Sequence, residues 1–218
     1  MKKGFTLAEV LITLVIIGVV AALTVPTLIT KYQKEQTVTR LKKAYSALSQ
    51  ATQRAIADYG VVRTWTFPEP GNGLETWEFA KKYIYPYMNV SVDCGTNTGG
   101  TCEFSYWLLN ESRKFTCDSR FVRFSLNDGT LIALRVYNHN TVSVYIDING
   151  KKKPNKLGRD VFSYTFSYNK GFTPNTNNTS RESLLGSGQY TCNLVATGEY
   201  CAAVIMKDGW RIADDYPW

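Results

Sequence analysis

The chain begins with a long apolar run. No charged residue occurs between Val10 and Thr30, whereas Lys2 and Lys3 precede this run and Lys31 follows it. Its 21 residues would form a helix of roughly 30 Å, which is the thickness of the hydrocarbon core of a bilayer. The lysines of the short leader favour a cytoplasmic N-terminus. The pattern therefore predicts one membrane-spanning helix, with the bulk of the chain outside the cytoplasm.

A helical pattern continues beyond Pro26, but it becomes amphipathic. Side chains suited to a buried face recur at spacings of three and four, at Val38, Leu41, Tyr45, Leu48, Thr52, Ala55 and Tyr59. This spacing places them along one face of a helix, and Gly60 is a suitable helix end. We therefore predict one long helix from about Phe5 to Tyr59, kinked or loosened at Pro26 because proline lacks a backbone N–H.

Strand-like patterns dominate the second half of the chain. The predicted elements after the long helix are a short helix at residues 74–84 and strands at residues 121–126, 130–137, 141–147, 161–168 and 202–207. Asn127-Asp128-Gly129 is a typical hairpin turn, so the first three strands form an antiparallel meander. A helix with one apolar stripe and a sheet with one apolar face must cover each other. The expected fold class is α+β, in which a long N-terminal helix, membrane-spanning in its first half, packs on an antiparallel β-sheet head.

Composition and charge exclude several classes of function. The chain has 218 residues, of which 44% are hydrophobic, and its net charge is +7. Removing the two leader lysines would leave 23 basic against 18 acidic residues, and an excess of +5 is too small to indicate nucleic-acid binding. A single histidine excludes paired-histidine zinc sites, and no phosphate-binding glycine loop or nucleophile elbow occurs. We therefore expect a protein that is not an enzyme.

An acidic residue, Glu9, lies at the start of the apolar run. A carboxylate costs a few kcal/mol to insert in this environment, so a partner is expected. Cleavage after Gly4 would free the amino group of Phe5, and glycine lets an enzyme approach the backbone closely. In a staggered stack of such helices, Glu9 of one subunit would neutralise the terminal ammonium of its neighbour. Gly4 and Phe5 are therefore the candidate processing site, and Glu9 is the candidate assembly residue.

The segment Gly-Phe-Thr-Leu-Ala-Glu-Val-Leu-Ile at residues 4–12 resembles the processing motif of type IV pilins and type II secretion pseudopilins. Gly18 and Pro26 lie where that family often has helix-loosening residues, so both are candidate kink positions. The resemblance implies that a membrane prepilin peptidase cuts between Gly4 and Phe5 and methylates the new amino terminus. It also implies a pilin-like fold, in agreement with the hydrophobic pattern.

The resulting domain organisation has four parts. Residues 1–4 are a prepilin leader, 5–30 a transmembrane and filament-core helix, 31–60 its amphipathic continuation, and 61–218 an extracytoplasmic globular head. The resemblance implies a structural subunit of a type IV pilus-like or type II secretion pseudopilus filament. The subunit starts as a single-pass protein of the bacterial cytoplasmic membrane, with its C-terminal head outside the cytoplasm. The alternative is a membrane-anchored extracytoplasmic binding domain that does not polymerise.

The implied partners follow from the same resemblance. They are the prepilin peptidase, other pilin or pseudopilin subunits bound through the N-terminal helix, and an inner-membrane assembly platform. The lipid bilayer surrounds the helix before assembly, and the modest charge argues against a nucleic-acid partner.

Five cysteines all lie in the predicted head. Cys94 and Cys102 flank one short polar loop, and Cys192 and Cys201 flank another. Such local spacings suit disulfides in an oxidising compartment, although a Cys102–Cys117 bond remains an alternative. Cys117 is the candidate free thiol. Because no C-x-x-C pair occurs, the spacing disfavours a structural zinc site.

A polar loop at residues 147–160 is the remaining candidate for chemistry. Oxygen atoms of Asp147, Asn149 and Asp160 are candidate ligands for Ca²⁺, which takes six to eight oxygens. Some pseudopilins that the chain resembles bind calcium in the head, but three consecutive lysines at residues 151–153 argue against a cation here. The alternative is a rigid surface turn in which Asp and Asn side chains accept nearby backbone N–H bonds. No cofactor is firmly indicated.

Overall fold

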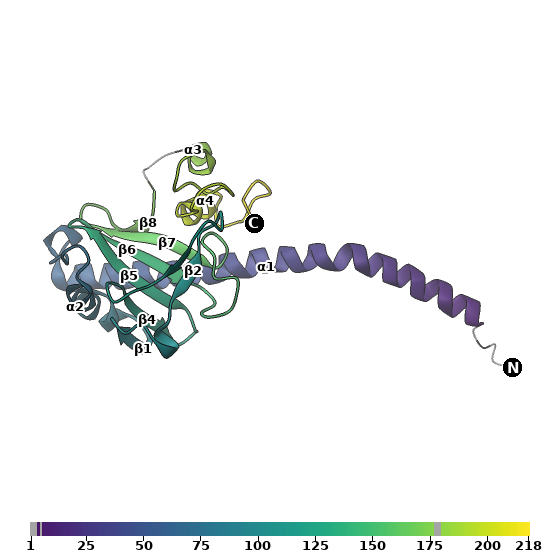
Figure 1. Ribbon diagram of the computed structural model, residues 1–218, viewed down its shortest axis with the longest axis horizontal. Coiled ribbons are helices and arrows are strands. Elements are labelled where there is room, and N and C mark those ends of the chain that lie inside the picture. The colour runs from purple at the N-terminus through teal and green to yellow at the C-terminus, as the bar shows by residue number, and fades with distance from the viewer. Residues whose placement is uncertain (1–3, 5, 177–179) are drawn as a thin grey trace. The chain divides into compact units, whose positions relative to one another are not determined.

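The computed structural model describes residue 4, residues 6–176 and residues 180–218. Its helices are α1 (Leu7–Tyr59), α2 (Gly73–Tyr83), α3 (Arg181–Leu185) and α4 (Cys201–Lys207). Its strands are β1 (Val90–Gly95), β2 (Ser105–Trp107), β3 (Lys114–Thr116), β4 (Val122–Leu126), β5 (Leu131–Asn138), β6 (Thr141–Asp147), β7 (Val161–Ser167) and β8 (Gly171–Pro174) (Figure 1). Two compact units meet within α1, one ending at Gln36 and the other beginning at Thr37.

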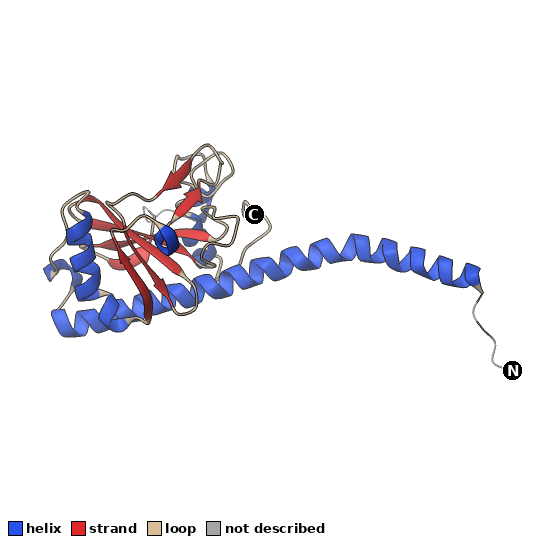
Figure 2. Cartoon of the chain, turned by 60° about the horizontal axis from the view of Figure 1, so that its bottom comes forward, coloured by secondary structure: helices blue, strands red, loops and turns tan. Residues whose placement is uncertain are grey.

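Helix α1 is continuous over 53 residues, as the long apolar and amphipathic patterns predict. Pro26 lies inside it without ending it, and the ribbon is unbroken there (Figure 2). The helix ends where Gly60 adopts a φ of +81°, a conformation that favours glycine.

The second part of α1, from Thr37 onward, has one buried face. Its buried residues are Val38, Leu41, Ala44, Leu48, Ala51, Thr52 and Ala55. Five of these belong to the predicted stripe. The prediction was wrong for Tyr59, which is 43% exposed, because the stripe drifts around the helix and the helix ends there. Ala44 and Ala51 complete the face.

The main sheet has six antiparallel strands in the order β1-β4-β5-β6-β7-β8. Strands β4, β5 and β6 form the predicted meander, and the next predicted strand is β7. Strand β1 adds to the β4 edge with two register irregularities. A separate two-stranded sheet pairs β2 with β3. The α+β, pilin-like fold class is therefore confirmed.

The strand predicted at residues 202–207 was wrong, because this segment forms α4, which contacts β7. Residues 201–205 are all buried. A short apolar run that is buried on every side has no periodicity to distinguish helix from strand. The two alanines, Ala202 and Ala203, favour the helix that the structure shows.

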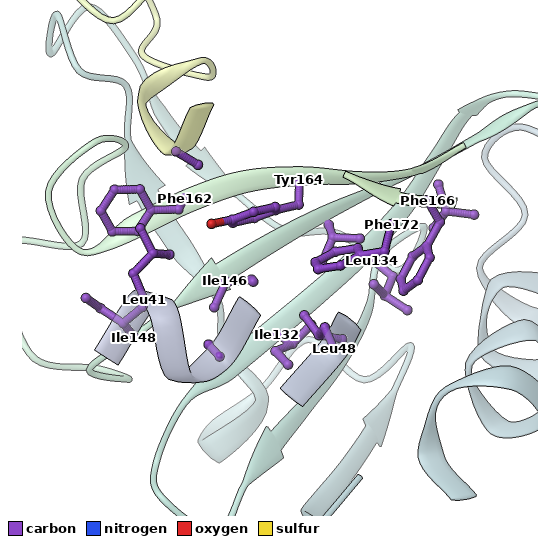
Figure 3. Packing of buried hydrophobic residues seen from close by; sticks show 14 of the residues in the cluster. Leu41, Leu48, Ile132, Leu134, Ile146, Ile148, Phe162, Tyr164, Phe166 and Phe172 are labelled. Carbon is purple, nitrogen blue, oxygen red and sulfur yellow. The ribbon is translucent and has the colours of Figure 1, made fainter. Parts of the chain in front are cut away.

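The core occupies both faces of the main sheet. On one face, α1 residues Leu41 and Leu48 join a cluster with strand residues, including Ile132, Ile146 and Phe166 (Figure 3). A second buried cluster covers the other face and contains Phe104, Tyr106, Leu108, Cys117, Phe121, Leu131, Ala133, Tyr145, Leu157 and Val161. The sequence pattern predicts one apolar sheet face, whereas the structure buries both. The β2–β3 hairpin and the loops beside it supply the second cover.

Candidate processing and assembly site

Glu9 lies in the first turn of α1 and is bonded to its own chain. Its Oε2 atom accepts the backbone N–H of Thr6 at 2.8 Å and the hydroxyl of Thr6 at 2.8 Å. The Thr6 Oγ1 atom in turn accepts the backbone N–H of Glu9 at 3.3 Å. This reciprocal arrangement is a capping box, and it places a negative charge at the positive end of the helix. Sequence reasoning assigned Glu9 only a partner in another subunit, although the Thr-x-x-Glu spacing indicates this cap.

The candidate cleavage position adjoins this cap. Gly4 is exposed and lies outside any regular element, two residues before the capping threonine. A Cβ atom placed on Gly4 would meet no atom within 4 Å. Phe5, the other half of the predicted processing site, lies outside the described residues. Cleavage between them remains a prediction.

The first part of α1 presents an apolar surface. Large hydrophobic side chains are exposed along this part of the helix, for example Leu7 at 79% and Leu23 at 72%. Among the described residues, α1 is the one helix that is long and apolar enough to cross a membrane. An exposed apolar surface of this size is typical of a segment that contacts lipid or other protein chains.

Three threonine hydroxyls within this apolar segment are bonded to their own helix. The hydroxyls of Thr13, Thr24 and Thr30 donate to the carbonyl oxygens of Val10, Val20 and Pro26 at 2.9, 2.9 and 3.0 Å. Such bonds allow threonine to lie in a non-aqueous environment.

The candidate kink residues lie in this same segment. Pro26 leaves the carbonyl of Ala22 without its usual helical donor because proline has no N–H. Gly18 has no atom within 4 Å of its missing Cβ position. Because glycine has no side chain, Gly18 leaves room there for a neighbouring helix.

The three candidate calcium ligands come together in the head. The Nδ2 atom of Asn149 donates to Asp160 Oδ2 at 3.1 Å, and the Oδ1 atom of Asp147 accepts the backbone N–H of Asn149 at 3.1 Å. Asp160 also accepts the backbone N–H groups of Asn155 and Lys156 at 2.8 and 2.7 Å. These are the bonds of a rigid turn, but both carboxyls are buried rather than at the surface.

Burial dominates the electrostatics of this turn. It raises the pKa of Asp147 to about 8, and the nearby Asp160 carboxylate adds to that effect. Burial likewise raises the pKa of Asp160. Among the described residues, no group of three or more His, Cys, Asp or Glu side chains is arranged to hold a metal. The calcium assignment stays a prediction.

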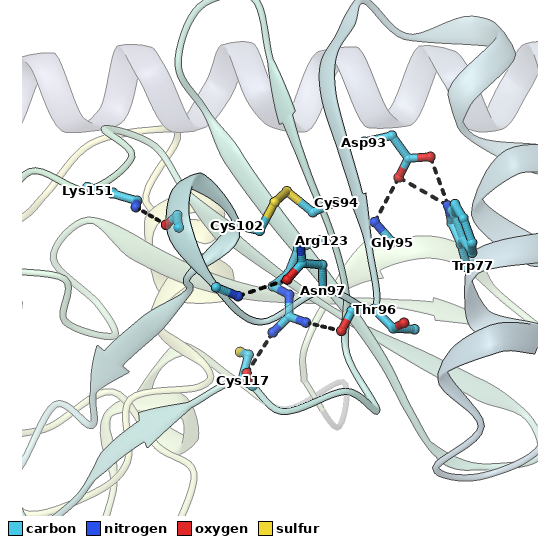
Figure 4. Close-up of a disulfide and its surroundings, with 12 residues drawn as sticks. Trp77, Asp93, Cys94, Gly95, Thr96, Asn97, Cys102, Cys117, Arg123 and Lys151 are labelled. Atoms are coloured by element: carbon cyan, nitrogen blue, oxygen red, sulfur yellow. Dashed lines mark hydrogen bonds between the residues drawn. A yellow bond between two sulfur atoms is a disulfide. The ribbon is translucent and has the colours of Figure 1, made fainter.

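Two disulfides join the pairs that the local spacing favours, Cys94–Cys102 and Cys192–Cys201. The Cys117 thiol is free and buried, and burial raises its pKa to about 12. Next to it lies a fully buried arginine that sequence reasoning missed. Arg123 donates to the carbonyl oxygens of Cys117 at 2.6 Å and Thr96 at 2.9 Å, and so ties the first disulfide loop to the segment before β4 (Figure 4).

The first disulfide loop has further attachments. The Nε1 atom of Trp77, on α2, donates to both carboxyl oxygens of Asp93, at 3.1 and 2.9 Å (Figure 4). The hydroxyl of Tyr85 donates to the same carboxylate at 2.8 Å. Lys151 donates to the carbonyl oxygen of Gly100 at 2.5 Å. These contacts attach the loop and the residue before it to α2, to Tyr85 and to the segment after β6.

Comparison with known families agrees with this reading. Residues 1–25 match the prokaryotic N-terminal methylation motif, which is typical of type IV pilins and pseudopilins. The motif and the fold together define a prepilin-like protein, and the motif implies processing by a prepilin peptidase. The chain belongs to the Family of unknown function (DUF6613), which matches residues 27–218. No curated protein and no solved structure matches the chain.

Proposed function

We propose that this protein is a structural subunit of a type IV pilus-like or type II secretion pseudopilus filament, assembled through its N-terminal helix. The observation that carries the proposal is Glu9, a carboxylate at the start of an exposed apolar helix and inside a methylation motif. The helix leaves lipid and enters a bundle of like helices, where apolar packing replaces lipid contact. A heterologous contact that does not close on itself then produces a fibre.

The capping box is compatible with a second partner for Glu9. Both described side-chain bonds use Oε2, and within the described part of the chain no bond to Oε1 is present. Cleavage between Gly4 and Phe5 would leave the Thr6 N–H intact, because the Phe5–Thr6 peptide bond is not cut. The carboxylate therefore caps its own helix through one oxygen and offers the other to the terminal ammonium of a neighbouring subunit. In a poorly hydrated bundle this pair fixes the axial register.

The same proposal assigns the parts of the chain and their partners. Residues 1–4 are the leader removed by prepilin peptidase, 5–30 the filament-core helix, 31–60 its continuation into the head, and 61–218 the head. The apolar helix and the two disulfides favour a membrane-anchored, extracytoplasmic protein. An inner-membrane platform and other pilin-like subunits complete the assembly.

The experiment compares Glu9→Gln with Thr6→Val in cells that carry the assembly machinery. Glu9→Gln removes the charge and keeps the shape, so we expect normal insertion and cleavage but at least a tenfold loss of sheared filaments. Thr6→Val removes the cap hydroxyl and keeps the Glu9 charge, so filaments should persist. Electron microscopy measures assembly, and mass spectrometry measures processing at Phe5.

Two results of these measurements would contradict the proposal. Wild-type amounts of filament from Glu9→Gln would show that the charge does not direct assembly. An uncut Met1 terminus, with no filament from the parent chain, would instead support the membrane-anchored binding domain.

A further inference from the structure

A cleft of about 680 Å³ opens in the head. Three parts of the chain line it: the β2–β3 hairpin, the adjoining ends of β5 and β6, and residues 189–199, which run into the loop closed by the Cys192–Cys201 disulfide. The filament proposal does not use this cleft. Its volume is within the range of small-molecule sites, which are typically lined by aromatic side chains with a few placed polar groups.

The floor and the rim of the cleft are aromatic. Tyr106 and Tyr145 are buried, and their rings stack with centroids 5.3 Å apart. Phe115 stacks on the Tyr106 ring at 5.7 Å. Tyr137 and Tyr190 line the opening and are 48% and 43% exposed. An incoming ligand therefore meets ring faces and edges on more than one side.

A carboxyl group lies among these rings. Glu199 lines the cleft, and its Oε2 atom accepts one hydrogen bond, from Asn175 Nδ2 at 2.8 Å. Within the described ranges, no lysine or arginine forms an ion pair with Glu199. Burial raises the pKa of this carboxyl. Glu199 is half-buried; a carboxylate partly shielded from water without an ion-pair partner is costly, and a cationic group placed beside it would reduce that cost.

The other polar groups of the cleft include an amide and a guanidinium that already have partners. The Asn110 amide is already occupied, because its Nδ2 donates to the Val195 carbonyl and its Oδ1 accepts from Ser112. The guanidinium of Arg113 lies over the Phe115 ring, 4.6 Å from its centroid. Among the described residues that line the cleft, Glu199 carries the one carboxyl group, so a ligand with a cationic donor complements it.

We propose that this cleft binds a ligand through an aliphatic ammonium group. An ammonium carries donors for the Glu199 carboxylate, and aromatic faces attract cations when both are shielded from water. The same chemistry occurs in a lysine side chain of a protein and in the amine headgroup of a lipid. The full chain in a non-ionic polyoxyethylene detergent is the appropriate sample, because that detergent carries neither an ammonium group nor a sugar.

The probes are ethanolamine and Nα-acetyl-lysine N-methylamide, titrated by saturation-transfer NMR. The neutral controls are propan-1-ol, which has the shape of ethanolamine, and methyl β-glucoside. We expect at least one cation to bind about tenfold or more tightly than either neutral compound, which corresponds to about 1.4 kcal/mol. Preference for the lysine amide indicates a protein ligand, and preference for ethanolamine indicates a lipid headgroup; either supports the site.

Three variants test the residues. Glu199→Gln should weaken cation binding about tenfold, whereas Glu103→Gln removes an exposed carboxylate outside the cleft and should leave binding unchanged. If Glu199→Gln lowers the melting temperature, Tyr190→Leu at the exposed rim provides the test, with an expected several-fold loss. Binding of neither cation more tightly than the neutral compounds, binding of the glucoside alone, no binding of either cation, or unchanged binding by Glu199→Gln and Tyr190→Leu would overturn the proposal.

Discussion

Replacement of Leu48 by alanine tests whether the second part of α1 and the sheet form one cooperative unit. Leu48 is fully buried in the same cluster as Ile132 and Phe172. The change removes three carbon atoms, and burial contributes about 0.8 kcal/mol for each, or roughly 2.4 kcal/mol. The cavity left behind adds to this, so we expect a total loss of about 3–4 kcal/mol.

Urea unfolding of the full chain in detergent, followed by tyrosine and tryptophan fluorescence, measures this loss. With a slope of about 2 kcal/mol per molar urea, the midpoint should fall by roughly 1.5–2 M. Gln50→Ala is the matched control, because Gln50 is exposed two residues along the same helix, and its effect should lie within about 0.5 kcal/mol. A midpoint for Leu48→Ala equal to that of Gln50→Ala would refute the packing of this helix segment on the sheet.

Three further predictions concern the head. First, burial raises the pKa of the Cys117 thiol to about 12, so this thiol should resist iodoacetamide at pH 8 in the folded protein. In urea without reductant, one thiol per chain should react. Mass spectrometry measures the labelling, and a labelled folded protein would contradict the prediction. Second, the double variant Cys192→Ser, Cys201→Ser removes the disulfide that closes a loop of sequence separation 9. It should lower the free energy of unfolding, measured by urea titration, by about 2.5 kcal/mol. An unchanged free energy would be inconsistent with the Cys192–Cys201 disulfide. Third, Arg181 bonds Asp208 and Asp215 and lowers the pKa of Asp215. A carboxyl with a lowered folded pKa stabilises the fold above its unfolded pKa of about 3.9, and this stability is lost as the pH falls through the folded value. The difference in Tm between the parent and Arg181→Met should therefore shrink below about pH 4, and a constant difference would exclude this pair as its source.

The sequence predicts the long helix and the meander because their signals are periodic and local. Leu41 and Leu48 repeat at helical spacing, and Asn127-Asp128-Gly129 specifies a turn by its own chemistry. Strand β1 and the β2–β3 hairpin are different. Their pairings depend on contacts with distant segments, and β2 and β3 have only three residues each, so no periodicity identifies them.

At the candidate sites, too, features formed by neighbouring residues are predictable from the sequence, whereas features formed by distant residues are not. The processing motif at residues 4–12 is contiguous, and the Thr6-x-x-Glu9 spacing also encodes the cap. Arg123 gave no such signal, because alternation in a strand does not show that a charged side chain is buried against two carbonyl oxygens. The cleft around Glu199 likewise joins residues that are far apart in sequence, and only the fold brings them together.

The two disulfides affect how the chain matures as well as how stable it is. Each joins cysteines only eight or nine residues apart, so each pair can meet before any strand of the main sheet has found its neighbour. Oxidation therefore requires no long-range search and no prior folding of the head. Cys117 is the thiol at risk of entering a wrong pair. Once the second buried cluster has formed around Cys117, this thiol can no longer take part in thiol–disulfide exchange. Folding therefore preserves the correct pairing.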